Sequence, residues 1–241
     1  LHSLQLELKD HSALQSDRLR LHVEKCFPAV REISGRRLFD IIVANFVLRS
    51  KALGPDLSSL ENFPCIIHEL LEVHRLPALC GVATLELRCV QALLQAEARP
   101  LNLKDLVCCS QGELLSGHIS LHPTAAIVCS VYPVVTLWIS RQRGPGILDC
   151  ATEWPEAALV LRPGAELAIT RLTLGLHSFL RALRSGLPVA AAAEYARVRD
   201  GLFQFPADLW RLLEVGAFSR FDAEMPRATG LRRRSRSRSL Q

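Results

Sequence analysis

The segment from Ala158 to Leu172 constrains the fold more than any other part of this chain. Residues 158–162 and 165–172 are rich in aliphatic and β-branched side chains, which is typical of strands. Between them lies Pro163-Gly164, a dipeptide that suits a tight turn. The pattern predicts a β-hairpin, and three helical patterns follow it directly. Two strands followed by three short helices are the layout of a module that recognises a peptide or a nucleic acid.

Capping and breaking residues mark the ends of these helices. Thr173 is a suitable N-cap for the first helix, which we expect to stop at Gly186. Pro188 and Pro206 suit the first turns of the second and third helices. After the third helix, residues 217–221 are expected to form a closing strand.

The first hundred residues show helical patterns throughout. A Leu-studded helix is expected over residues 1–25, and Phe27-Pro28 opens a helix that Ser34-Gly35 interrupts. Further helices are predicted over 36–50, from Leu60 to Val73, and from Pro77 to about Arg99, with a loop at 54–56. This part of the chain is therefore expected to form a helical bundle.

After Asp105 the pattern changes. Residues 117–129 are β-branched and bounded by turn residues, so we expect one strand there, followed by a short apolar helix from Pro133 to Arg141. We therefore predict an α+β fold in which the N-terminal helical bundle spans residues 1–105. A C-terminal winged-helix-like peptide-recognition domain, with three strands and three helices, is expected over 106–225. Residues 226–241 are expected to be a disordered Arg/Ser-rich tail, because they hold too few apolar groups to fold.

The net charge of +5 comes from this tail. Residues 226–241 hold six arginines and no acid, and without them 23 basic residues face 24 acidic ones, a net charge of −1. A nucleic-acid-binding domain normally carries its positive charge on the folded surface. Nucleic acid is therefore a disfavoured partner. The tail could bind RNA or an acidic surface, but its length and terminal position favour a solubilising or non-specific tail.

Composition also bears on the cellular compartment. No apolar run reaches the roughly 18 residues that span a bilayer, so we expect a cytoplasmic protein without membrane association. The eight cysteines include no C-x-x-C pair, which leaves a structural zinc site without support. We expect free thiols, with the vicinal Cys108-Cys109 as the one pair that could be redox-active.

The histidines form no familiar catalytic arrangement. His68 and His74 enclose a segment like that of zinc proteases, but they are six residues apart. Six residues turn the second histidine about 240° from the first on a helix, whereas the protease motif needs a spacing of four. His118 and His122 lie on one side of a predicted strand without acidic or thiol partners at hand. Because no nucleophile elbow or phosphate loop is present either, a stand-alone enzyme is disfavoured.

Several segments together resemble a known family. In chain order they are Phe27-Pro28-Ala29-Val30-Arg31, Gly35, Leu38-Phe39, Asp56-Leu57-Ser58-Ser59-Leu60, Leu76-Pro77-Ala78-Leu79, Leu85-Glu86, Leu121-His122-Pro123, Tyr132-Pro133-Val134, Leu137-Trp138, Leu161-Arg162-Pro163-Gly164 and Leu212-Leu213-Glu214-Val215-Gly216-Ala217-Phe218. The ordered set resembles the partner-protein family of the multinuclear non-haem iron-dependent oxidative enzymes. That family includes the methanobactin biosynthesis protein MbnC and the HvfC-type proteins. The Arg/Ser tail lies outside the family pattern.

The resemblance implies a non-catalytic subunit. Such a protein forms a heterodimer with a TIM-barrel iron oxygenase and holds the leader of a ribosomal precursor peptide, so that a core cysteine reaches the iron. For methanobactin the product is an oxazolone with an adjacent thioamide. The iron belongs to the partner subunit, so no cofactor is expected in this chain.

A leader peptide can add as a strand to the edge of a sheet, where main-chain hydrogen bonds supply affinity. We therefore expect the hairpin strands to lie in that sheet, with peptide-binding residues Leu159, Leu161, Arg162, Leu167, Ile169 and Arg171. Arg162 and Arg171 are expected to pair with leader carboxylates, the alternative being ordinary solvated strand charges.

The rival interpretation is a winged-helix-like DNA-binding regulator. A recognition helix should carry clustered Lys and Arg. Residues 206–216 hold only Arg211 against Asp208 and Glu214, and the preceding helix has only Arg197 and Arg199 near its end. The sequence thus favours peptide recognition over DNA recognition.

Overall fold

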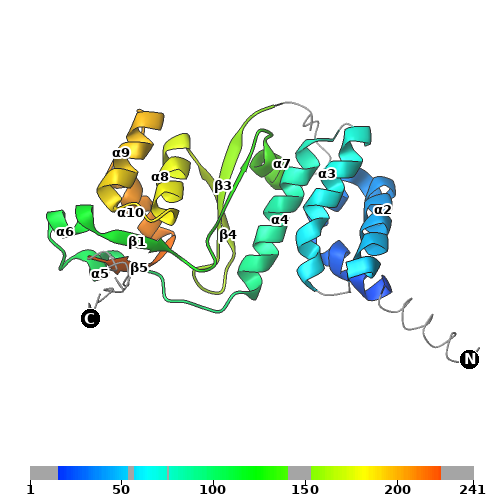
Figure 1. Cartoon of the computed structure of the whole chain (residues 1–241), viewed down its shortest axis with the longest axis horizontal. Helices are drawn as coiled ribbons and strands as arrows, with labels where there is room; N and C mark the ends of the chain where they lie inside the picture. Colours follow the sequence, from blue (N-terminus) through cyan, green and yellow to red (C-terminus); the bar gives the residue numbers. More distant parts are fainter. Residues whose placement is uncertain (1–15, 54–56, 75, 141–152, 224–241) are drawn as a thin grey trace, which may run out of the picture.

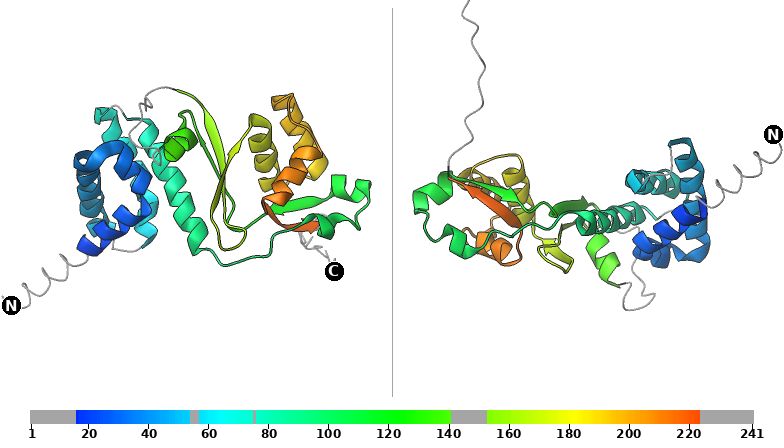
Figure 2. Two further views of the ribbon diagram at one scale, coloured as in Figure 1. Left: turned by 180° about the vertical axis from the view of Figure 1, so that it is seen from behind. Right: turned by 90° about the horizontal axis from the view of Figure 1, so that it is seen from below.

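A computed structural model describes residues 16–53, 57–74, 76–140 and 153–223. The fold is α+β, with helices and two small antiparallel sheets. Figures 1 and 2 show an elongated molecule, with a lobe of helices at one end and a lobe of strands and helices at the other. A three-stranded sheet lies between the two lobes. The expected tail and the loop at 54–56 lie outside the described residues.

The helical lobe holds residues 16–26, which are helical, then α2 (Pro28–Leu53), η1 (Leu57–Asn62), α3 (Phe63–His74) and α4 (Ala78–Leu94). The predicted interruption at Gly35 is confirmed, because its φ of 75° breaks α2. The ring centroid of Phe63 lies 4.2 Å from that of Phe27, with the rings tilted, and 5.3 Å from that of Phe46, with the rings edge to face. These rings anchor the core of the lobe.

The N-terminus of α2 is capped by a residue far away in the sequence. The buried carboxylate of Glu86, on α4, accepts hydrogen bonds from the backbone N–H groups of Ala29 (2.7 Å) and Val30 (3.1 Å). These donors have no partner inside their own helix, so the carboxylate satisfies them and joins α2 to α4.

Helix α4 ends earlier than predicted. It stops at Leu94, where Gln95 turns to extended backbone, and Leu93 is more than half exposed. Two short helices not predicted from the sequence follow, α5 (Leu103–Leu106) and α6 (Gln111–Ser116). Each begins with a capping box, formed by Asn102 with Asp105 and by Ser110 with Glu113.

The prediction of a single strand over residues 117–129 is wrong. There are two strands here, β1 (His118–Leu121) and β2 (Ala126–Ser130), in different sheets. The backbone N–H of Ala125 donates to the carbonyl of His122 at 2.8 Å, which closes a turn around Pro123. β1 pairs with β5 (Phe218–Asp222), the closing strand that was predicted at 217–221.

The three-stranded sheet has the order β2-β3-β4 and is antiparallel throughout. β3 (Glu156–Leu161) and β4 (Ala168–Leu172) form the predicted hairpin, and α7 (Val134–Ser140) connects β2 to β3. Successive residues of β3 point into different cores. Ala158 and Val160 pack with α4 and α7, whereas Leu159 and Leu161 pack with α8. Apolar packing therefore crosses the expected boundary between residues 105 and 106.

The three helices after the hairpin form as predicted. They are α8 (Leu174–Arg184), α9 (Val189–Arg199) and α10 (Ala207–Glu214). The hydroxyl of Thr173 accepts from the Leu176 N–H, and Gly186 takes a φ of 83° after α8. α9 and α10 each begin one residue after a proline, so Pro188 and Pro206 are N-cap residues and lie just before the first turns in which they were expected. Among the described residues, no helix combines the length and the apolar character needed to cross a membrane.

Candidate functional site

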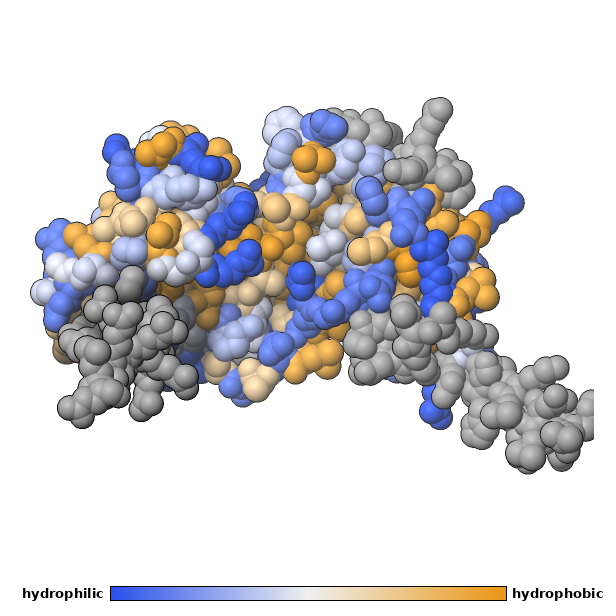
Figure 3. Space-filling view, in the orientation of Figure 1, coloured by the Kyte–Doolittle hydropathy of each residue, from blue (hydrophilic) through white to orange (hydrophobic). Residues whose placement is uncertain are grey.

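The three-stranded sheet has two edge strands, β2 and β4, and the predicted site residues point to β4. It lies at one end of the strand order, and among the described strands only β3 pairs with it. An edge strand presents a row of N–H and C=O groups that can pair with another chain. Residues 168–170 are half-buried and Arg171 is exposed, so solvent reaches part of each of these residues. On the face drawn in Figure 3, apolar side chains line the hollow between the two lobes, in the region of β3 and β4.

Three predicted site residues lie on or beside β4. Ile169 faces the same side of the sheet as Val160, its partner in the register. Leu167, just before the strand, and Ile169 both pack partly against the core of the helical lobe. Arg171 follows on the same side because side chains two apart on a strand share a face. The structure therefore brings these three residues together along β4.

A buried carboxylate holds Arg171. Arg171 Nη2 lies 2.9 Å from Glu156 Oε1 and donates to the Thr136 hydroxyl at 2.6 Å. Glu156 also accepts from the backbone N–H groups of Val135 (2.8 Å) and Thr136 (2.9 Å). The Glu156 side chain is 3% exposed and that of Arg171 is 54% exposed, so the guanidinium is fixed on one side and open on the other.

This arrangement sets what Arg171 can do. The pair with Glu156 is close to neutral, so it attracts a distant anion weakly. In the part of the chain that the structure describes, Nε and Nη1 of Arg171 make no hydrogen bond, so they can donate to a carboxylate or carbonyl that arrives at the edge. Arg171 is suited to fixing the register of a bound strand. Sequence reasoning did not find Glu156 or Thr136; the only local signal was an acid at the start of an apolar strand.

Leu159 and Leu161 do not belong to this site. Both lie on β3, the central strand, and are 0% and 1% exposed. Their side chains pack in the core around α8. The expectation that they contact a peptide is corrected by their position in the middle of the sheet.

The side chain of Arg162 also lies away from the site. Its guanidinium donates to the carbonyl oxygens of Ala92 (3.0 Å), Gln95 (2.6 Å) and Gly164 (2.9 Å). The residue is only 9% exposed, and the carbonyls of Ala92 and Gln95 belong to the C-terminal end of α4. Arg162 therefore caps a helix and is not available to a leader carboxylate.

The backbone of Arg162 joins a second buried cluster. The Thr124 hydroxyl lies 3.0 Å from the Arg162 N–H and 2.8 Å from His122 Nδ1. His122 Nε2 lies 3.0 Å from the carbonyl of Ala98, to which it can only donate. Residues 121–123 and 161–164 thus meet in one network of hydrogen bonds. This network joins the turn of the β3–β4 hairpin to the chain after α4.

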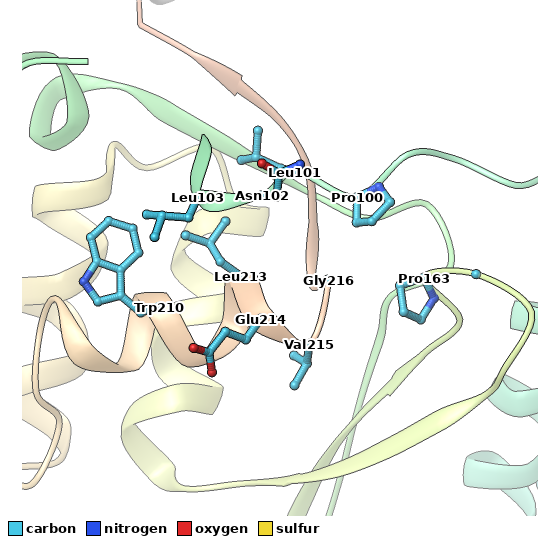
Figure 4. A pocket seen from close by; sticks show the side chains of 11 residues that line it. Pro100, Leu101, Asn102, Leu103, Pro163, Trp210, Leu213, Glu214, Val215 and Gly216 are labelled. Atoms are coloured by element: carbon cyan, nitrogen blue, oxygen red, sulfur yellow. The ribbon is translucent and has the colours of Figure 1, made fainter. Parts of the chain in front are cut away.

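A pocket of about 550 Å³ lies beside this turn (Figure 4). It is lined by Pro100, Leu101, Asn102, Leu103, Pro163, Gly164, Trp210, Leu213, Glu214, Val215 and Gly216. Gly216 has a φ of 75°, and a Cβ atom there would lie 2.7 Å from the Cβ of Pro163. The close approach explains why glycine stands at this position. The mostly apolar lining suits an apolar side chain, and no pattern in the sequence indicated the pocket.

Groups that could bind a metal are scattered. Within the described residues, no group of three or more His, Cys, Asp or Glu side chains could hold an ion. His68 is exposed on α3, and the side chain of His74 lies outside the described part. Cys108 and Cys109 are free thiols.

Comparison with protein-family models and with curated protein sequences finds no match for the chain.

Proposed function

We propose that this chain is the non-catalytic partner subunit of a heterodimeric, iron-dependent peptide-modifying oxygenase in the cytoplasm. It binds the leader of a ribosomal precursor peptide and presents the core cysteine to the iron of a TIM-barrel partner. The single observation that carries the proposal is the open edge of β4, at the end of a three-stranded sheet that three helices follow. The ordered segments that resemble the MbnC- and HvfC-type family support the identity of the partner.

In this proposal the leader adds to β4 as a fourth strand. The five residues of β4 span roughly 17 Å and offer main-chain hydrogen bonds along that length. Leu167 and Ile169 provide partly exposed apolar contacts, and Arg171 donates to a polar group at the end of the strand. The pocket between Pro163 and Trp210 provides a place for an apolar leader residue near the turn.

The winged-helix-like architecture is part of the proposal. We interpret β2, β3 and β4 with α8, α9 and α10 as the peptide-recognition unit, although α7 is inserted between its first two strands. The iron ligands and the oxygen chemistry belong to the partner subunit. A methanobactin-type reaction, which converts a cysteine to an oxazolone with a thioamide, is the transformation that we assign to the pair.

Reconstitution tests this function. The chain is co-expressed with a candidate TIM-barrel iron protein and a candidate precursor peptide, and the mass of the peptide is measured. We expect a stable heterodimer that modifies the precursor, no modification by either subunit alone, and no modification of a precursor that lacks its leader. Modification by the isolated chain, or stoichiometric iron in that chain, contradicts the proposal.

A further inference from the structure

The outward face of α8 is a basic stripe. Leu174, His177, Arg181 and Arg184 follow one another at spacings of three, four and three residues, which places them on one side of the helix. The two arginines are exposed and His177 is half-buried. α8 contains no acidic residue, so nothing on the helix itself offsets this charge.

The end of α9 extends the stripe with apolar residues and one more cation. The Gly175 N–H donates to Asp200 Oδ2 at 2.9 Å, which holds the segment after α9 against the start of α8. Leu174, Val198 and Leu202 are 58%, 75% and 86% exposed. Arg199 lies 4.6 Å above the ring of Tyr195. We call the set Leu174, His177, Arg181, Arg184, Val198, Arg199 and Leu202 the α8–α9 surface.

Positive charge outweighs negative charge on the α8–α9 surface. Among the residues that the structure describes, Arg181 and Arg184 form no ion pair. Of the neighbouring acids, Glu194 pairs with Arg197, whereas Asp200 accepts from two backbone N–H groups and keeps its negative charge.

The imidazole of His177 lies in the positive potential of the same arginines. Burial, followed by the charges of Arg181, Arg184 and Arg199, lowers the pKa of its imidazole below the usual value. Its Nε2 atom is buried and has no hydrogen-bond partner in the described residues. Cations from both helices therefore act on one point of the surface.

We propose that the α8–α9 surface binds an acidic peptide segment of a partner protein, in which carboxylates meet Arg181 and Arg184 and an apolar residue covers Leu174, Val198 and Leu202. The two arginines lie about 4.5 Å apart along the helix axis, close enough for neighbouring carboxylates of one short segment. The exposed leucines and valine suit a peptide that carries apolar residues among its acids.

A nucleic acid fits this surface less well. A DNA-binding protein can contact roughly six to ten phosphates. The α8–α9 surface offers only three arginines, on two helices of eleven residues each. The large apolar side chains next to them have no partner on a phosphate backbone. The inference goes beyond the proposed function, because it concerns the outward face of α8 and does not depend on strand addition at β4.

A site-specific readout is needed because the Arg-rich residues 227–238 attract any acidic probe. We use the full chain and follow the ring protons of His177 by NMR, with the signal assigned from a His177→Gln variant. The probes are a 12-residue peptide of three Glu-Glu-Leu-Ser repeats, the same peptide with Gln for Glu, and a DNA duplex of 12 base pairs. An anion bound beside His177 raises its pKa, whereas an anion bound at the tail leaves it unchanged.

We expect the Glu peptide to raise the pKa of His177, and the Gln peptide to leave it in place. In an Arg181→Ala, Arg184→Ala variant the Glu peptide should bind this site at least tenfold more weakly. An Arg49→Ala, Arg220→Ala variant is the matched control, because it loses the same charge from exposed arginines elsewhere. Its affinity should stay within twofold of the unmodified chain. An equal response to the Gln peptide, an unchanged affinity in the first variant, or a stronger response to DNA than to the Glu peptide overturns the proposal.

Discussion

The Nε atom of Arg162 lies 3.0 Å from the carbonyl oxygen of Ala92, so the turn of the β3–β4 hairpin closes the end of α4. The contact joins residues 70 positions apart and lies between the two cores. A side chain expected to bind a ligand is instead a structural connection between the helical lobe and the sheet.

Replacing Arg162 should therefore weaken the fold. Arg162→Ala leaves the carbonyls of Ala92, Gln95 and Gly164 without their donor, and we expect the free energy of unfolding to fall by about 2–4 kcal/mol. Urea denaturation followed by circular dichroism measures the loss. Arg37→Ala, an exposed residue of α2, is the control and should leave the midpoint unchanged. An equal midpoint for both variants would show that Arg162 does not cap α4.

Gly216 should tolerate no side chain. Gly216→Ala places a Cβ 2.7 Å from the Cβ of Pro163 at a φ of 75°, so both contact and backbone oppose it. We expect a loss of about 2–3 kcal/mol in thermal or urea unfolding. Gly164→Ala is the matched control, because a Cβ there meets nothing within 4 Å. A stable Gly216→Ala variant would contradict the close approach of the two turns.

The role of Glu156 as the anchor of Arg171 can also be tested by unfolding measurements. Glu156→Ala removes the acceptor for two backbone N–H groups of α7 as well as for Arg171, so we expect a loss of about 2–3 kcal/mol. Glu166→Ala, at an exposed position of the hairpin turn, should have no measurable effect. If Glu156→Ala were as stable as Glu166→Ala, the carboxylate would not organise this end of the sheet.

His177 should make the stability depend on pH. Its pKa is lowered in the folded protein, mainly by burial and then by the charge of three arginines, so the folded state resists protonation. The free energy of unfolding should be highest above the unfolded pKa of about 6.5 and should fall as the pH drops towards the folded pKa. Denaturation at pH 7.5 and 5.5 should show a smaller difference for His177→Gln than for the unmodified chain. An equal difference in both proteins would contradict the lowered pKa of His177.

Local signals predicted the local structure well. The Thr173 cap, the stop at Gly186 and the break at Gly35 are each decided by a few neighbouring residues, and all three are confirmed. The capping boxes that begin α5 and α6 are equally local and were readable from Asn102 to Glu113. The α+β class follows from such signals added together.

Long-range contacts determine the features that could not be predicted from the sequence. Leu159 is in the core because β3 is the central strand, and that order is a property of the whole sheet. Arg162 is buried because its acceptors come from α4, some 70 residues earlier in the chain. The division of residues 117–129 into two strands depends on the pairing of β1 with β5, at the far end of the sequence. Hydrophobic pattern and charge alone cannot distinguish a central strand from an edge strand in these cases.

Peptide binding at the edge of β4 is tested most directly by amide hydrogen exchange of residues 168–172. The full chain is measured alone and with the precursor peptide that the reconstituted pair modifies. We predict that the peptide slows exchange at the outward-facing amides of β4, while the amides of β5 in the other sheet keep their rates. Peptide binding that leaves exchange along β4 unchanged would contradict strand addition at this edge.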